Sequence, residues 1–248
     1  MAGRLRMKSE FLSTAAHELR TPMASIYGFA EVMLTQDLEA ASQREFLEII
    51  YKQSELMASI LNELLDLARI EARRGKDFVF EATPLQALIE EVVRAFKPPA
   101  GRPAPTLIAA AAHLVVLADH KKAQQAVLNV LSNAYKYSPA GGVVRIELLE
   151  SRADGARPNM LGICITDHGI GMTPAQLERV FERFYRADSS GKVPGTGLGM
   201  SIVQEIITLH RGTIDLKSTI GEGTTVTLWL PICNDSENLL KPTARTST

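Results

Sequence analysis

A seven-residue repeat of apolar side chains runs through the N-terminal part of the chain and limits what it can form. One series falls at Leu12, Leu19, Ile26 and Met33. A second series, mostly at steps of three or four residues, falls at Phe46, Ile50, Met57, Ile60, Leu64 and Leu67. Both spacings predict amphipathic helices, and the polar stretch 35–43 between them predicts a connection. We therefore expect an all-α helical hairpin.

Two helices alone bury little apolar surface, and heptad spacing is typical of helical bundles. Two copies of the hairpin are therefore expected to pair as a homodimer, which forms a four-helix bundle.

The pattern changes after residue 76, where short apolar runs alternate with helical periodicity. Helices are expected over 85–96, 121–137 and 198–210, with a proline-rich loop over 97–105. Strands are expected over 106–111, 114–118, 143–151, 161–167, 212–218 and 223–231. This order predicts an α/β domain, a mixed sheet covered on one face by helices. The expected domains are 1–76 and 77–233, followed by a flexible tail over 234–248.

Composition excludes several classes of protein. The formal net charge is -1, so the chain lacks the basic surface of a nucleic-acid binder, and no nucleic-acid partner is expected. Its two cysteines, Cys164 and Cys233, are too few for a disulfide framework or a zinc site. No apolar run approaches the ~20 residues that a membrane span requires.

His17 lies on the outward face of the first helix when Leu12 and Leu19 take the first heptad position. Thr21, four residues on, shares that face. Glu18 can accept a hydrogen bond from one ring nitrogen, which leaves the other as a nucleophile. Pro22 removes a backbone N–H and predicts a kink. Taken alone, the pattern also fits an exposed histidine beside a chance proline.

Asn129, Asn133 and Lys136 share one side of the helix expected over 121–137. Amide oxygens suit Mg²⁺, which binds largely through phosphates and water, and lysine supplies a point charge for phosphate. A solvated polar face is the alternative.

Asp167 follows an apolar strand in the sequence DHGIGM, residues 167–172. A carboxylate there can accept a hydrogen bond from the 6-amino group of adenine and would reject guanine. Gly169 and Gly171 would let the backbone approach the flat base. Glycine turns after strands are common, so this motif is weak by itself.

A glycine-rich run, Gly195–Gly199, opens the helix expected over 198–210. Accessible backbone N–H groups at a helix N-terminus favour anions. The run lacks the lysine of a phosphate-binding Walker loop. The polar segment 186–194 before it, next to the aromatic stretch 181–185, predicts a lid over a nucleotide, with Arg186 or Lys192 reaching phosphates. A plain surface loop is the alternative.

The order of these motifs resembles a known family. An asparagine helix, D-x-G-x-G, an aromatic box and G-x-G-x-G resemble the Bergerat-type α+β sandwich of histidine kinases, gyrases and related ATPases. The strings NVLSNAYKYS, DHGIGM, FERFYR and GTGLG resemble the histidine-kinase branch. FLSTAAHELRTP, residues 11–22, resembles the phospho-acceptor box of sensor histidine kinases.

The resemblance implies roles for individual residues. His17 would be the phospho-accepting nucleophile, Glu18 its base, and Thr21 the residue that positions water in a phosphatase reaction. Asn133 would bind Mg²⁺, and Asn129 would stand where related ATPases keep a catalytic acid. The remaining ATP-binding residues, led by Asp167 with Thr224 supporting it, would be Lys136, Tyr137, Gly169, Gly171, Arg186, Lys192, Gly195, Thr196, Gly197, Leu198 and Gly199.

The implied reaction is two-component signal transduction. ATP would phosphorylate His17, and an aspartate of a response-regulator receiver domain would take the phosphoryl group. The sensor domain would lie upstream of this chain, in a cytoplasmic protein or the cytoplasmic portion of a membrane-bound sensor. A scaffold that only binds ATP would be expected to have lost motif residues. A gyrase- or chaperone-type ATPase would need a glutamate in place of Asn129.

Overall fold

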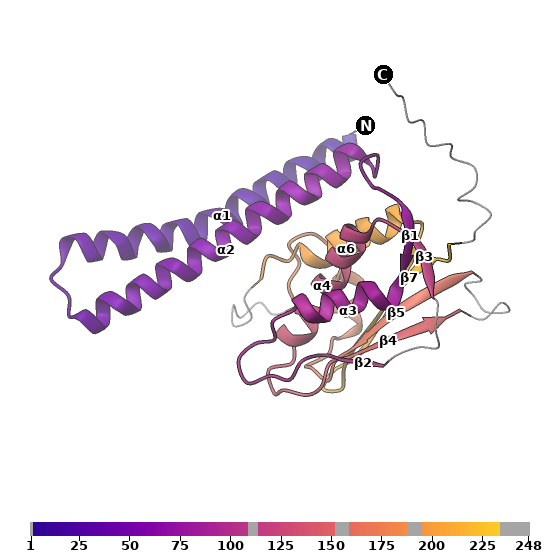
Figure 1. The fold of residues 1–248 in the computed structure, drawn as a ribbon. Helices are drawn as coiled ribbons and strands as arrows, with labels where there is room; N and C mark the ends of the chain where they lie inside the picture. The colour runs from indigo at the N-terminus through magenta and orange to yellow at the C-terminus, as the bar shows by residue number, and fades with distance from the viewer. Residues whose placement is uncertain (1, 109–113, 152–158, 188–194, 234–248) are drawn as a thin grey trace, which may run out of the picture. The chain divides into compact units, whose positions relative to one another are not determined.

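A computed structural model describes residues 2–108, 114–151, 159–187 and 195–233, with side chains described from residue 13 onward (Figure 1). The chain divides into two compact units. The hairpin unit comprises Met1–Arg73 and Glu178–Ile202, and the sheet unit comprises Arg74–Leu177 and Val203–Thr248. Two short helices, α5 (Pro174–Arg179) and α6 (Gly199–Leu209), run across the boundaries between these stretches.

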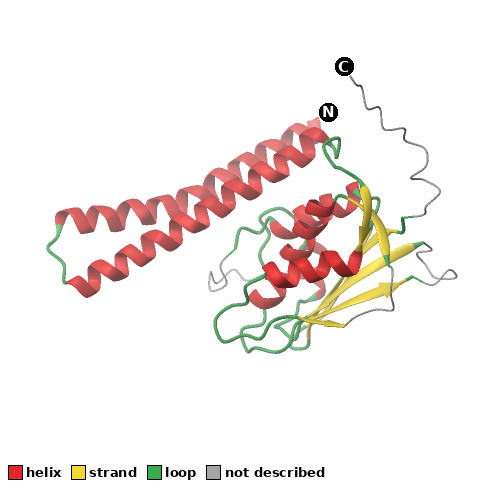
Figure 2. Ribbon diagram, viewed as in Figure 1, coloured by secondary structure: helices red, strands yellow, loops and turns green. Residues whose placement is uncertain are grey.

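The hairpin unit contains the two long helices that the heptad repeat predicts (Figure 2). Helix α1 spans Ala2–Thr35 and helix α2 spans Ala40–Arg73. Phe29 of α1 packs on Phe46 of α2 with ring centroids 5.0 Å apart, close to the connection. Helix α1 continues through Pro22, so the proline does not end the helix.

One hairpin cannot cover its own apolar residues. Ile60, Leu67 and Ile70 of α2 are buried, and they recur at the spacing of a helical seam. Among the side chains that the structure describes in the two helices, seven large apolar or aromatic ones are nevertheless exposed: Met23, Tyr27, Leu34, Leu47, Tyr51, Leu61 and Leu65. Met23 stands four residues after Leu19, beside the apolar repeat of α1, yet 55% of its surface is accessible in the single chain.

The sheet unit is built on a five-stranded mixed sheet with the strand order β2-β4-β5-β7-β6. The strands are β2 (Thr106–Ile108), β4 (Arg145–Glu150), β5 (Met160–Thr166), β6 (Thr213–Thr219) and β7 (Gly223–Pro231). Strand β2 pairs parallel with β4, and the other pairs are antiparallel. A separate ribbon pairs β1 (Glu81–Pro84) with β3 (Val115–Ala118).

Helices α3 (Leu85–Ala95) and α4 (His120–Lys136) lie with α6 on one face of this sheet (Figure 1). Helix α3 buries residues at the spacing i, i+3, i+4 and i+7, namely Leu85, Leu88, Ile89 and Val92. The predicted mixed sheet with helices on one face is therefore confirmed. Among the described residues, no helix combines the length and apolar character that a membrane-spanning helix needs.

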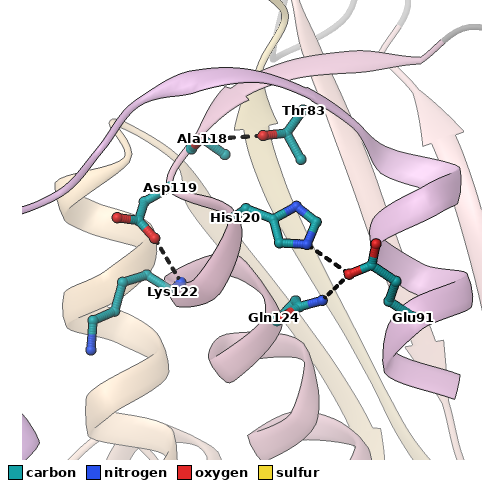
Figure 3. Close-up of polar contacts among 7 residues, drawn as sticks. All are labelled: Thr83, Glu91, Ala118, Asp119, His120, Lys122 and Gln124. Carbon is teal, nitrogen blue, oxygen red and sulfur yellow. Dashed lines mark hydrogen bonds and ion pairs between the residues drawn. The ribbon is translucent and has the colours of Figure 1, made fainter. Parts of the chain in front are cut away.

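Polar contacts fix the start of α4 (Figure 3). Asp119 caps the helix, since its carboxylate accepts a hydrogen bond from the Lys122 backbone N–H at 3.0 Å. Glu91 of α3 accepts a hydrogen bond from Gln124 Nε2 at 2.7 Å and lies 2.8 Å from His120 Nε2. The same carboxylate thus ties α3 to the first turns of α4.

The sequence did not predict β1 and α5. Strand β1 has four residues, of which only Thr83 is buried, so it has no alternating pattern to detect. Helix α5 has six residues and buries none of them. Of the strand expected over 106–111, the structure describes residues 106–108, and the expected tail 234–248 lies outside the described residues.

Candidate phospho-acceptor and nucleotide sites

His17 faces solvent on α1, as its heptad position predicts, with 74% of its side chain accessible. Its Nδ1 lies 4.0 Å from Glu18 Oε1, which is longer than a hydrogen bond. Adjacent residues on a helix do not face each other, which explains the gap. The Thr21 hydroxyl points back along the same face and donates to the His17 backbone carbonyl at 3.5 Å. The ring is therefore accessible, and the expected bond to Glu18 is not formed.

Helix α4 presents the polar residues that the sequence placed on one side. Asn129, Asn133, Lys136 and the following Tyr137 are half-buried, while Val127 and Leu131 are buried on the other side. The helix ends at Lys136 and is capped by Tyr137, whose backbone N–H donates to the Asn133 carbonyl at 2.9 Å. In the part of the chain that the structure describes, no three His, Cys, Asp or Glu side chains gather as a metal site.

Asp167 follows β5 directly, and only 8% of it is exposed. Its Oδ1 accepts hydrogen bonds from the backbone N–H groups of Gly169 at 2.8 Å and Thr224 at 3.2 Å. Burial raises the pKa of the carboxyl group, and the two backbone donors offset part of that rise. The group is thus a buried acceptor held in one orientation by two neighbouring segments.

The two glycines after Asp167 are required by the chain's own packing. A Cβ atom on Gly169 would overlap the Tyr137 carbonyl oxygen and lie 2.8 Å from Ser138 Oγ. Gly171 has a φ of +65°, and a Cβ there would overlap the Thr219 carbonyl oxygen. The sequence predicted that these glycines let the backbone approach the nucleotide base. In the structure they allow two other backbone segments of the chain to approach closely.

The glycine-rich run belongs to the hairpin unit. Gly197 has a φ of +73°, and its carbonyl accepts a hydrogen bond from the Phe184 backbone N–H at 2.9 Å. The Leu198 backbone N–H donates to Thr196 Oγ1 at 3.2 Å, and Leu198 is buried. This arrangement leads directly into α6, which begins at Gly199 with Gly195 four residues before it.

Comparison with known proteins gives two matched family models. Residues 7–73 match the His Kinase A (phospho-acceptor) domain, and residues 118–234 match the histidine kinase-, DNA gyrase B- and HSP90-like ATPase. The chain is 30% identical to a solved mycobacterial sensor histidine kinase, MprB, covering 98% of that chain and 62% of this one, with a TM-score of 0.52.

This chain belongs to the sensor histidine kinases.

Two further relatives align with most of this histidine kinase chain, and another solved structure shares its fold. It is 34% identical over 236 residues to the histidine protein kinase DivJ of Caulobacter vibrioides, and 33% identical over 243 residues to the non-motile and phage-resistance protein of the same organism. These alignments cover 93% and 95% of this chain but only 38% and 28% of the relatives. The histidine kinase AdeS of Acinetobacter baumannii shares the fold, with a TM-score of 0.64 at 22% identity, covering 88% of this chain and 98% of that chain.

The structure thus places the candidate residues of this histidine kinase in three groups. His17 and Thr21 share one face of α1, Asp167 contacts Gly169 and Thr224, and the glycine-rich run packs on Phe184. Arg186 is half-buried, and Lys192 lies outside the described residues.

Two residues beside Asp167 were missed by the sequence reasoning. Ser138 is 1% exposed, its hydroxyl donates to the Ala134 carbonyl at 2.7 Å, and it helps to lower the pKa of the Asp167 carboxyl group. Gly223 has a φ of +113°, and a Cβ there would overlap the Asp167 backbone oxygen. Both residues lie next to positions that the sequence singled out, because Ser138 ends the string NVLSNAYKYS and Gly223 precedes Thr224 at the start of β7.

Proposed function

We propose that this chain transfers the γ-phosphoryl group of ATP to His17 and then to an aspartate of a response-regulator receiver domain. The observation that supports it best is the exposed imidazole of His17 on the phospho-acceptor helix of a chain that also carries an ATPase domain.

The chemistry of the first step suits the residues around His17. One ring nitrogen attacks the γ-phosphorus, a nitrogen–phosphorus bond forms, and the bond from phosphorus to the bridging oxygen breaks. ADP leaves with that electron pair. The phosphorylated ring then gives up the proton on its other nitrogen, and the Glu18 carboxylate, whose Oε1 lies 4.0 Å from Nδ1, is the base that would receive it.

Asp167 is the proposed reader of the base. The buried carboxylate is already held by two backbone donors. It can therefore accept a hydrogen bond from the 6-amino group of adenine without changing its orientation. Thr224 supports it through its backbone N–H, and Gly169 and Gly171 hold the segment against its neighbours. The other proposed nucleotide contacts are those of Lys136, Tyr137, Arg186, Lys192, Gly195, Thr196, Gly197, Leu198 and Gly199.

Mg²⁺ fits the donor set on α4. The half-buried amide of Asn133 offers one hard oxygen, the kind of ligand suited to an ion that is bound mainly by phosphate oxygens and water. When bound, the ion neutralises charge on the triphosphate. Asn129 carries an amide, which cannot accept a proton from water, so we expect little direct hydrolysis of ATP.

We also propose a phosphatase reaction toward the phosphorylated regulator, in which the Thr21 hydroxyl orients a water molecule. Its place one turn from His17 on the same face supports this role.

A homodimer is the proposed assembly, because the exposed apolar residues of the hairpin are those that a four-helix bundle would bury. We place the dimerisation and phosphotransfer domain at 1–76, the ATP-binding domain at 77–233 and a tail at 234–248. The sensor that controls them would lie upstream, with this part acting in the cytoplasm.

The test is incubation with Mg²⁺ and ATP labelled at the γ-phosphate. The proposal requires label that is acid-labile, base-stable and lost in both His17→Gln and Asn133→Ala. Label that survives in His17→Gln would assign the acceptor elsewhere. Bound ATP with no label in the wild type would instead favour a scaffold that only binds ATP.

A further inference from the structure

Arg102 lies in the proline-rich loop over 97–105, to which the sequence gave no role. Its Nη1 donates to the Ser138 backbone carbonyl at 2.5 Å, and its Nη2 donates to the Gly142 carbonyl at 3.2 Å. The guanidinium also stands 5.2 Å from the ring centroid of Tyr135. The Tyr135 hydroxyl of α4 donates a hydrogen bond to the Pro103 carbonyl of the same loop at 2.7 Å. The loop is thus fastened to the end of α4.

The two carbonyls that Arg102 binds mark the ends of one turn. The Gly141 backbone N–H donates to the Ser138 carbonyl at 3.1 Å, which closes the turn, and Gly141 and Gly142 have φ values of +96° and +100°. Glycine gives such a turn little intrinsic stiffness. The Arg102 guanidinium binds the carbonyls of the first and last residues of the turn and thereby restricts the motion of its backbone.

This turn forms one side of the Asp167 segment. The Tyr137 carbonyl, just before the turn, accepts a hydrogen bond from the Ile170 backbone N–H at 3.0 Å. Ser138 Oγ, which donates to the Ala134 carbonyl at 2.7 Å, would stand 2.8 Å from a Cβ atom on Gly169, so the first residue of the turn packs closely on the segment after Asp167. Movement of the turn would therefore move the segment that carries Asp167.

Beyond the turn, His168 Nδ1 lies 3.3 Å from the Val143 carbonyl oxygen. The residues on both sides of the turn thus contact the segment that carries Asp167.

We propose that Arg102 is a positioning residue for base recognition. Its guanidinium fixes the Ser138–Gly142 turn, and the turn fixes the Asp167 carboxylate where it meets the 6-amino group of the base. The inference rests on the proposed role of Asp167. It predicts that Arg102 affects recognition of the base and leaves phosphate binding and phosphoryl transfer unchanged.

The test compares ADP with inosine diphosphate, which has the same ribose and phosphates but an oxygen in place of the 6-amino group. Affinities for both are measured by titration calorimetry on the wild type, Arg102→Met and Arg102→Lys. Arg145→Met serves as the matched control, because Arg145 is an exposed arginine on β4. Autophosphorylation at saturating ATP and the Tm of each variant are measured in parallel.

We expect Arg102→Met to weaken ADP binding on the order of 10-fold, the cost of loosening one charged hydrogen bond to the base. Binding of inosine diphosphate and the rate at saturating ATP should change less than about twofold. Arg102→Lys should lose part of the preference, because one ammonium cannot hold both carbonyls as the fork does. Arg145→Met should behave as the wild type.

Two results would contradict the inference, and they separate a failure of the proposed role of Asp167 from a failure of the proposed role of Arg102. A wild type that binds both nucleotides equally would remove the role of Asp167 in reading the base. A wild type that prefers ADP, with Arg102 variants that keep the same preference or lose both nucleotides equally, would leave Asp167 in place and reduce Arg102 to a structural residue.

Discussion

Replacing Gly169 with alanine tests whether the pocket depends on the close approach of two backbone segments. The added methyl group would overlap the Tyr137 carbonyl oxygen and lie 2.8 Å from Ser138 Oγ and 2.9 Å from Asp167 Oδ1. Overpacking of this kind costs ~1–3 kcal/mol. For a chain of this size, each kcal/mol lowers the Tm by ~2–4 °C, so we expect a loss of roughly 2–12 °C.

The effect on nucleotide binding should exceed the effect on folding. If the methyl group displaces the Asp167 carboxylate, the protein loses a charged hydrogen bond to the base worth ~1.5–3 kcal/mol. That corresponds to ADP binding about 10- to 150-fold weaker. Calorimetric titration with ADP, at a temperature where the variant is folded, measures it.

Gly212→Ala is the matched control. A Cβ atom on Gly212 would stand at the same short distance from a backbone oxygen, that of Trp229, on a different turn of the sheet unit. We expect a similar loss of Tm and unchanged ADP affinity. Equal loss of ADP affinity in both variants, or full affinity in Gly169→Ala, would refute the reasoning.

Three further predictions concern titration and helix stability. His210 is buried, which lowers the pKa of its ring, and its Nε2 accepts the Asp119 backbone N–H at 2.9 Å. The free energy of unfolding should have its full contribution from His210 above the ordinary histidine pKa of 6.5. That contribution should fall as the pH drops from 6.5 toward the lowered pKa of His210 in the folded protein. His210→Phe should cost ~1–3 kcal/mol at pH 8 and flatten that dependence in denaturant titrations; a dependence equal to the wild type would contradict it. The pKa of Asp167 is raised above its ordinary 3.8 and the ionised form is the acceptor, so ADP affinity should begin to fall above the pH at which an exposed aspartate titrates. Affinity that stays constant down to pH 4 would count against that acceptor. Gly28 lies inside α1, and apart from its own helix backbone no described part of the chain lies within 4 Å of an added Cβ. Gly28→Ala should therefore raise hairpin stability by ~0.5–1 kcal/mol in thermal unfolding, and a loss would indicate that a second chain packs there.

The sequence predicted the parts of the fold in which periodicity is long. The apolar repeats cover residues 12–33 of α1 and 46–67 of α2, helices of 34 residues each, and packing follows the first repeat closely enough that His17 points outward. Helix α5 lacks such a repeat, but it had a local signal. Thr173 Oγ1 accepts the Gln176 backbone N–H at 3.1 Å, while Gln176 Oε1 accepts the Thr173 N–H at 2.8 Å. This reciprocal pair is a capping box, and TPAQ in the sequence encodes it.

Contacts between distant segments were beyond sequence reasoning. Nothing local to Gly169 indicates that the Tyr137 carbonyl stands beside it, and nothing local to Arg102 indicates that it bridges Ser138 and Gly142. These contacts depend on how the loop 97–105, the end of α4 and the end of β5 meet, and tertiary packing sets that arrangement. The motif predicted a functional role for Asp167, whereas only the structure identifies the backbone groups that hold its carboxylate.

The strand order of the sheet has a consequence for self-association. Strands β2 and β6 are its two edges, and an edge strand offers unpaired backbone groups to any other chain. Strand β2, described over Thr106–Ile108, follows Pro105 directly, while β6 carries Asp215 and Lys217. A neighbouring proline and charged side chains discourage edge-to-edge pairing. The sheet is thereby protected from forming mixed sheets at high concentration, which leaves the apolar surface of the hairpin as the place where we expect two copies to meet.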